Sequence, residues 1–241
     1  MPRMVQTRWL LLGFSACVLL GSPSNVLAQS ANLQGSFQGP KNAGIDVTAD
    51  PSYRLQLDNS SVRAFLIEIE PGKSTQLHWH DYDYMVITLA DSTVGELVMK
   101  PTNEGDAKKH RPTGGSMATY KLDKKLGDEW RTKGGILHML TNGMNVPYRN
   151  VTLEFRGGEK KVPVTEAIVL KTGESANRDW HSANHLLVFL TDAKLKDAVL
   201  GQQDTLLEHK VGEVAWLPAG KSHTFTNSET GPALVTTVEF R

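Results

Sequence analysis

The residues of this chain with the clearest capacity for metal chemistry are histidines that occur in two similar segments. In each segment five residues separate a glycine from the start of the motif. The first segment reads His78-Trp79-His80 followed by Tyr84, and the second reads Asp179-Trp180-His181 followed by His185. Each half then supplies one more histidine, His138 or His223. Neutral imidazoles that meet at one point can bind Fe, Mn, Ni, Cu or Zn. The pattern therefore predicts a divalent transition-metal site, and the spacing does not decide which metal.

The strand period explains how the first histidine pair would converge. Residues two apart on a β-strand point to the same side, so His78 and His80 are expected to face an interior while Trp79 faces away. His138 follows about 60 residues later and would have to arrive from a separate strand of a closed sheet. The same alternation predicts that Trp180 faces outward in the second half, where it is interpreted, like Trp79, as a packing or interface residue.

The two halves match one another at constant spacings. The histidine segments match at an offset of 101 residues, from Gly72 to Gly173 and from Tyr84 to His185. Five later positions match at an offset of 85 residues: Gly127, Lys133, Gly135, His138 and Asn142 correspond to Gly212, Pro218, Gly220, His223 and Asn227. Such self-similarity predicts one structural unit built twice. Within it, the glycines are interpreted as turn residues and the asparagines as side chains that hold a loop.

Short apolar runs closed by turn residues predict that both units are all-β. The runs at 85–89 and 186–190 suit buried strands, and no segment has a long helical period. We expect the units at 53–158 and 159–241. Asp91 to Gly127 spans 36 residues while Asp192 to Gly212 spans 20, so the first unit has 16 extra residues, placed at 101–116. Their composition is that of a loop, either a lid over a cavity or a solvated hairpin tip.

These residues resemble the two sequence motifs of the cupin superfamily. The second family motif, a Gly, Pro-x-Gly, His and Asn series, is matched in full by residues 212–227 and with Lys133 in place of proline in the first half. The resemblance covers roughly residues 53 to 241. It implies two tandem double-stranded jelly-roll barrels, a small bicupin, with any metal or ligand held inside a barrel.

Both copies of the first motif depart from the family pattern. Tyr84 stands where the family has a ligand glutamate, so the resemblance implies the three-histidine set of some metal-dependent cupin dioxygenases, His78, His80 and His138. Tyr84 should still point inward, as a catalytic residue that meets the substrate. The corresponding positions of the second half hold one carboxylate and three imidazoles, which form a second candidate metal site: Asp179, His181, His185 and His223.

Two functions from different classes are compatible with these motifs. One is a metal-dependent enzyme of the oxygenase type that acts on a small organic molecule in the first barrel. The other is a non-catalytic protein that binds a small ligand or serves as a scaffold, its inward histidines bonded only to each other, to neighbouring side chains or to water. Fold resemblance alone cannot choose between them. A homodimer through an outer sheet is compatible with either function.

The N-terminal residues predict export. Arg3 and Arg8 precede an apolar run at 9–20, and Val26-Leu27-Ala28 resembles a cleavage site. We therefore expect a signal peptide at 1–28 that is cleaved after Ala28. The run of about 12 residues is too short for a membrane span, which needs roughly 20. The protein is therefore expected in the periplasm or secreted medium, free of the membrane. Residues 29–52 are expected to form an exposed arm.

The composition of the mature chain narrows the partners. Without residues 1–28 the chain has 24 Lys and Arg against 26 Asp and Glu, a formal charge of −2. Nucleic-acid binders usually have a surplus of basic residues, so we do not expect a nucleic-acid partner. The expected partner is a small molecule. Signal cleavage also removes Cys17, the only cysteine. Packing rather than disulfide bonds must therefore stabilise the fold.

Overall fold

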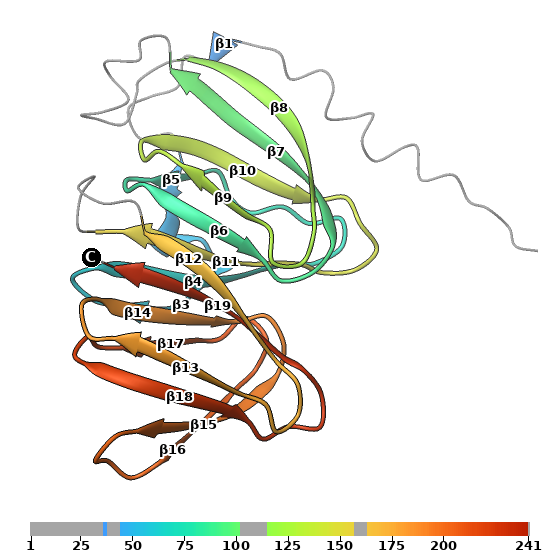
Figure 1. The fold of residues 1–241 in the computed structure, drawn as a ribbon. Coiled ribbons are helices and arrows are strands. Elements are labelled where there is room, and N and C mark those ends of the chain that lie inside the picture. Colours follow the sequence, from blue (N-terminus) through green and yellow to red (C-terminus); the bar gives the residue numbers. More distant parts are fainter. Residues whose placement is uncertain (1–35, 38–43, 102–114, 157–162, 241) are drawn as a thin grey trace, which may run out of the picture.

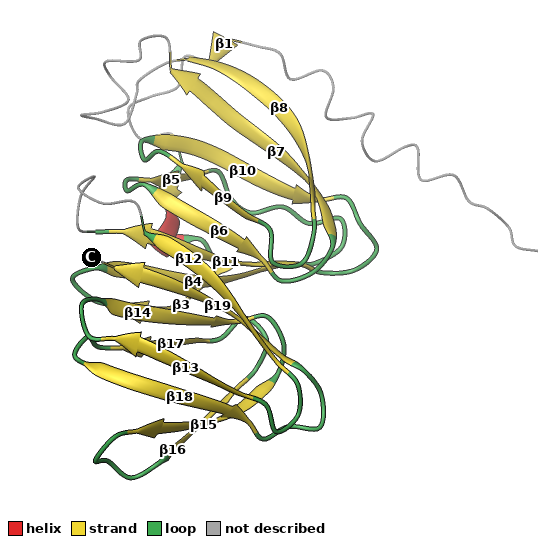
Figure 2. Ribbon diagram, viewed as in Figure 1, coloured by secondary structure: helices red, strands yellow, loops and turns green. Residues whose placement is uncertain are grey.

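The structure, a computed structural model, describes residues 36–37, 44–101, 115–156 and 163–240. Within these residues the chain is built from β-strands that form four sheets, two in each of two stacked barrels (Figure 1). A single 3-10 turn at Val47–Ala49 is the helical segment of the described part (Figure 2). The expected all-β fold of two tandem jelly-roll barrels is confirmed.

The first barrel combines a six-stranded and a five-stranded sheet. The six-stranded sheet contains, in spatial order, β1 (Ser36–Phe37), β8 (Gly115–Lys124), β7 (Ser92–Pro101), β10 (Ile136–Asn142), β5 (His78–His80) and β2 (Ile45–Asp46). The five-stranded sheet contains β3 (Tyr53–Asp58), β4 (Val62–Ile69), β11 (Tyr148–Phe155), β6 (Tyr84–Thr88) and β9 (Glu129–Thr132). Neighbouring strands are antiparallel except β2 and β5, which pair in parallel.

The second barrel combines two four-stranded sheets. One contains β12 (Val164–Leu170), β19 (Ala233–Phe240), β14 (Asn184–Phe189) and β17 (Val214–Leu217). The other contains β13 (Ser175–Trp180), β18 (Lys221–Asn227), β15 (Ala193–Val199) and β16 (Thr205–His209). All of these pairings are antiparallel.

A shared apolar layer joins the two barrels. Strands β4, β6 and β11 of the first barrel contact β14 and β19 of the second through a buried cluster that includes Leu66, Met85, Leu153, Leu186 and Val238. Because alternate residues of β4 also fill the interior of the first barrel, this strand is buried on both faces and its sequence is almost continuously apolar. The same reason accounts for the apolar run of β14.

Matched asparagines close a loop at the same place in each barrel. The amide nitrogen of Asn142 donates to the carbonyl oxygens of Ile69 and Val146, both at 2.8 Å. The amide of Asn227 donates to the carbonyls of Leu170 and Gly231, at 3.0 and 2.8 Å. The interpretation of these asparagines as loop-holding residues is confirmed.

The N-terminal arm differs from expectation. Residues 45–46 form β2, which pairs with β5, and Val47 and Asp50 are buried at 0% and 2% exposure. Residues 36–37 form β1, which pairs with β8. The prediction of an exposed arm over 29–52 is therefore wrong for Val47 and Asp50, because the edge of the sheet beside β5 pairs with this part of the chain.

Two other expectations fall largely outside the described residues. Of the predicted insertion at 101–116, Pro101 ends β7 and Gly115 and Ser116 begin β8, while 102–114 are not described. The proposed signal peptide at 1–28 is not described either. In the part of the chain that is described, no helix is long and apolar enough to span a bilayer.

The shared apolar layer predicts where the fold is most sensitive to substitution. Leu186→Ala removes a fully buried side chain between the barrels and should destabilise the protein by about 2–5 kcal/mol in urea unfolding. The control Leu200→Ala changes a residue that is 98% exposed and should stay within about 0.5 kcal/mol of wild type. Equal effects of the two substitutions would contradict a stabilising contact between the barrels.

Candidate metal centre

Neighbouring strands bring three histidines together inside the first barrel. His78 and His80 lie two apart on β5, and His138 on β10 pairs directly with His78. All three are buried, with exposed fractions of 0%, 0% and 3%. Their potential ligand nitrogens lie within 4.8 Å of one another, and this is the one such group among the described residues. The structure therefore assembles the three histidines that the sequence pattern selected.

Each of these imidazoles is held from behind by an acceptor. The Nδ1 of His78 lies 2.8 Å from the Gln76 carbonyl and 3.0 Å from the Asp50 carboxylate. The Nδ1 of His80 lies 2.8 Å from the carboxylate of Glu154, and the Nδ1 of His138 lies 2.7 Å from that of Glu96. A carbonyl or an ionised carboxylate can only accept, so each Nδ1 must carry the proton and each Nε2 a lone pair.

The opposite nitrogens have no partner. The Nε2 atoms of His78, His80 and His138 are buried and make no hydrogen bond. A buried polar atom without a partner costs free energy, and three at one point require an explanation. Histidine ligands of metals characteristically donate their other nitrogen to a carboxylate or carbonyl. The donor set therefore fits a metal ion that is coordinated by three Nε2 atoms.

The charges around the histidines also favour a bound metal cation. The carboxylates that contact them, Asp50, Glu96 and Glu154, carry three negative charges when ionised. The one cation paired with this group in the described structure is Arg63, whose Nε and a terminal nitrogen donate to Glu154 at 2.8 and 2.5 Å. The sum is −2 in an interior where unbalanced charge is costly. A divalent cation would bring the group to neutrality.

Burial keeps two of these histidines, His80 and His138, neutral. Burial lowers the pKa of His80 well below its usual range, and the neighbouring histidines lower it further. Burial also lowers the pKa of His138, although the hydrogen bond to Glu96 opposes the shift. Burial raises the pKa of Glu154 to about 7 in spite of Arg63. Near neutral pH the imidazoles of His80 and His138 are therefore neutral and able to coordinate a metal, and Glu154 has a pKa in the same range.

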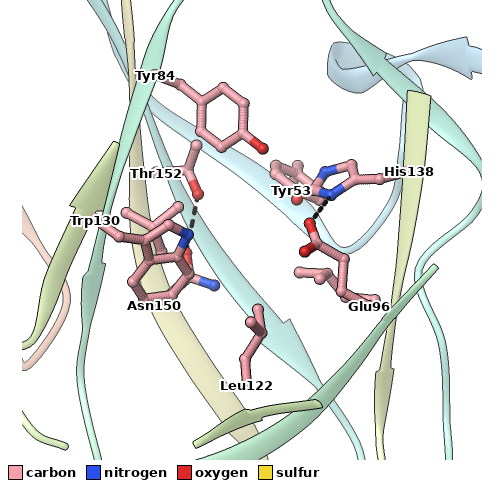
Figure 3. A pocket seen from close by; sticks show the side chains of 10 residues that line it. Tyr53, Tyr84, Glu96, Leu122, Trp130, His138, Asn150 and Thr152 are labelled. Carbon is pink, nitrogen blue, oxygen red and sulfur yellow. Dashed lines mark hydrogen bonds and ion pairs between the residues drawn. The ribbon is translucent and has the colours of Figure 1, made fainter. Parts of the chain in front are cut away.

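A small hollow adjoins His138 (Figure 3). The hydroxyl of Tyr84 points toward His138, with Trp130 and Asn150 on the opposite wall. The ring of Tyr84 stacks on His80, with centroids 4.1 Å apart, and the residue is only 2% exposed. The free space in the hollow is about the size of one water molecule. Tyr84 thus points inward beside the histidines, as strand alternation predicted, and a molecule bound there would contact it.

The second candidate set is not brought together. Asp179 and His181 contact each other on the surface, with side chains 78% and 59% exposed. His185 and His223 are buried at 3% and 4% exposure, and both contact the ring of Trp180. Trp180 is itself 6% exposed, so the expectation that it faces outward is wrong. Trp79 is also buried, packed against Met99 and Leu137 as a packing residue.

The two barrels differ by one residue in the register of the strand that carries the first motif. In the first, the strand runs four residues from Ser74 to His78 while its partner runs three, from Thr141 to His138. In the second, Ser175 to Arg178 and Thr226 to His223 are three residues each. An extra residue of this kind is a β-bulge, and it changes which side chains face inward. Arg178 and Trp180, not Asp179 and His181, therefore occupy the positions of His78 and His80.

The carboxylates behind the histidines were missed by motif reasoning. Asp50, Glu96 and Glu154 come from three separate segments, and no local pattern links them to the histidines. A signal was present in the repeat. Glu96 matches Asp197 at the 101-residue offset, and Asp197 contacts the Nδ1 of His223 at 3.0 Å just as Glu96 contacts His138. An acidic residue at the same place in both halves would have pointed to this contact.

Solved structures share this architecture. A mutant of oxalate decarboxylase from Bacillus subtilis has a TM-score of 0.53 at 10% identity, over 75% of this chain and 69% of its own. AerE from Microcystis aeruginosa has a TM-score of 0.52 at 13% identity, over 80% of this chain and 99% of its own. Vicilin from tomato, Solanum lycopersicum, has a TM-score of 0.52 at 10% identity, over 75% and 74%.

The chain has the two-barrel cupin fold. No family model and no curated protein matches this sequence. At identities this low the similarity to the solved structures establishes the fold of the chain and leaves its reaction open.

The carboxylate behind His138 should tune metal affinity. Glu96→Gln keeps an acceptor for the His138 Nδ1 but removes the negative charge. The Zn²⁺ affinity of the protein should therefore fall about 10-fold, as measured by competition with a chromophoric chelator. The control Glu208→Gln alters a carboxylate that is 62% exposed on β16 and should leave the affinity unchanged. An unchanged affinity in Glu96→Gln would show that this contact does not serve a metal.

Metal binding should depend on pH through Glu154. Below a pH of about 7 this carboxyl is protonated in the metal-free protein, and a cation must displace that proton. The Zn²⁺ affinity should therefore rise with pH up to about 7 and level off above it, where Glu154 is already ionised. The lowered pKa values keep His80 and His138 neutral in this range. The rise should be about 10-fold per pH unit at most, as for one proton, and should vanish in Glu154→Gln. A steeper rise would mean that the histidines titrate there instead.

Proposed function

We propose that the first barrel binds one divalent transition metal ion through His78, His80 and His138 and acts, as an oxygenase-type enzyme, on a small organic molecule in the adjoining hollow. The observation that carries the proposal is the set of three buried Nε2 atoms without a partner. Fe, Mn, Ni, Cu and Zn all suit three neutral imidazoles. Such an ion supplies Lewis acidity when bound, and redox chemistry if it is Fe, Mn or Cu. The overall negative charge of the group is the second support.

Tyr84 is proposed as the residue that meets the substrate. Burial raises the pKa of its hydroxyl above the usual range, so the hydroxyl stays protonated. Tyr84 therefore acts as a hydrogen-bond donor that orients an oxygen atom of the substrate, and not as a base. Its stacking on His80 fixes the ring, so the direction of the donated bond is set before a substrate arrives.

A non-catalytic role is the second candidate, and the small size of the hollow favours it. Free space for about one water molecule admits only a compact ligand unless the side chains that line the hollow move. In this case the barrel would hold a metal and a small ligand without turning it over. For either role we propose a location outside the cytoplasm, because of the signal-like residues 1–28.

Elemental analysis tests the proposal directly. The mature protein, purified without chelator, should contain about one transition-metal ion per chain, and His138→Ala should lose it because two imidazoles remain. The control His181→Ala changes an exposed histidine of the second barrel and should keep the ion. A wild-type protein that neither contains nor takes up Fe, Mn, Ni, Cu or Zn would refute the metal site.

Oxygen uptake then separates the two roles. The metal-loaded protein is offered small diketones, thiols and phenols, and dioxygen consumption is recorded. Uptake that is lost in both His138→Ala and Tyr84→Phe, with metal retained in the latter, is the result expected of the enzyme. Binding of one of these molecules without oxygen uptake would instead support the non-catalytic role.

A further inference from the structure

The hollow beside His138 is lined by aromatic and uncharged polar groups with one carboxylate. Tyr53 and Tyr84 bring phenol rings and Trp130 brings an indole. Glu96 is the one carboxylate of the lining, and the one histidine, His138, is neutral. No lysine or arginine belongs to this lining, all of which lies in the described part of the chain. The hollow therefore offers an anionic ligand no side-chain cation.

The nearby cations are engaged elsewhere. Arg63 donates to Glu154, and its guanidinium carbon lies 5.4 and 5.7 Å from the ring centres of Phe65 and Tyr82. The ammonium of Lys124 lies 4.6 Å from the centre of the Trp130 ring and is not part of the lining. Neither side chain contributes a donor to the floor of the hollow, so a bound metal ion would be the one positive charge available there.

The charge of that ion is already balanced. Three ionised carboxylates and Arg63 leave the group at −2, and a divalent ion brings the sum to zero. A carboxylate ligand would return an uncompensated negative charge to a buried site and would lie beside Glu96. An uncharged ligand adds no such cost. It can accept hydrogen bonds from Tyr84 and place an apolar body against Trp130 and Leu122.

We infer that the metal-loaded first barrel selects an uncharged small molecule with a carbonyl or hydroxyl oxygen and excludes carboxylate anions. This inference rests on the proposed function, because the metal supplies the charge that completes the balance. It narrows the substrate class to neutral compounds such as amides, ketones and alcohols. Glu96 acts as the residue that determines this specificity, since its carboxylate faces the same space as the ligand.

Matched pairs of ligands that differ only in charge test the inference. Calorimetry at pH 8 compares formamide with formate and acetamide with acetate, pairs chosen because the free space of the hollow admits only a compact ligand. The full mature protein is loaded with Zn²⁺ and its metal content is measured in parallel. Each neutral compound should bind at least 10-fold more tightly than its anion. Glu96→Gln, compared at equal metal occupancy, should narrow that ratio by removing the negative charge next to the ligand.

Variants of tyrosine separate the hollow from the rest of the surface. Tyr84→Phe removes a hydroxyl donor and should weaken acetamide binding about 5- to 10-fold. Tyr120→Phe, on a residue 38% exposed on β8 and outside the lining, should not change it. Equal weakening by the two variants would overturn the placement of the ligand in this hollow.

The outcomes distinguish this inference from the proposed function. Protein that takes up no Zn²⁺ refutes the metal site and with it the proposed function. Protein that is fully loaded but binds the anions as tightly as the amides, or binds none of the four compounds, overturns the substrate class and leaves the metal site standing.

Discussion

The interior of the first barrel depends on the hydrogen bonds between three imidazole Nδ1 atoms and the carboxylates of Asp50, Glu96 and Glu154. These bonds favour one tautomer and one orientation of each ring and leave the three buried Nε2 atoms without a hydrogen-bond partner, and the potential ligand nitrogens lie within 4.8 Å of one another. They also bring three negative charges into a region with a single paired cation, Arg63. Burial of these charges costs free energy, and the arrangement suits the coordination of a divalent ion.

The two barrels show how little separates a polar site from a packed interior. They share the loop-holding asparagine, the second-motif histidine and the acidic residue behind it. The bulge between Ser74 and His78 turns two histidines inward in the first barrel. Without it, Arg178 and Trp180 take the same positions in the second barrel, where the indole stacks on His185 with centroids 4.1 Å apart. In the second barrel Trp180 therefore contacts His185 and His223, at the place where the first barrel has its three histidines.

Stability and chemistry are located in different layers of the molecule. The apolar layer between the barrels contains residues such as Leu66, Leu153 and Leu186, none of which lines the hollow. Because this layer is large and fully buried, it can offset the cost of the charged group in the first barrel. The chain lacks a cysteine beyond Cys17, so this layer also takes the place of disulfide bonds.

The sequence by itself determined the duplicated all-β fold, the inward pair His78 and His80, and His138 as their partner, because motif spacing and strand alternation are local properties. Tyr84 followed for the same reason. Only the tertiary structure decided which carboxylates stand behind the rings, since Asp50, Glu96 and Glu154 reach them from separate segments of the chain. It also decided that Asp179 and His181 lie on the surface. A single-residue bulge, present in the first barrel and absent in the second, changes which side chains of a strand face inward, and the spacing of the motif does not reveal it.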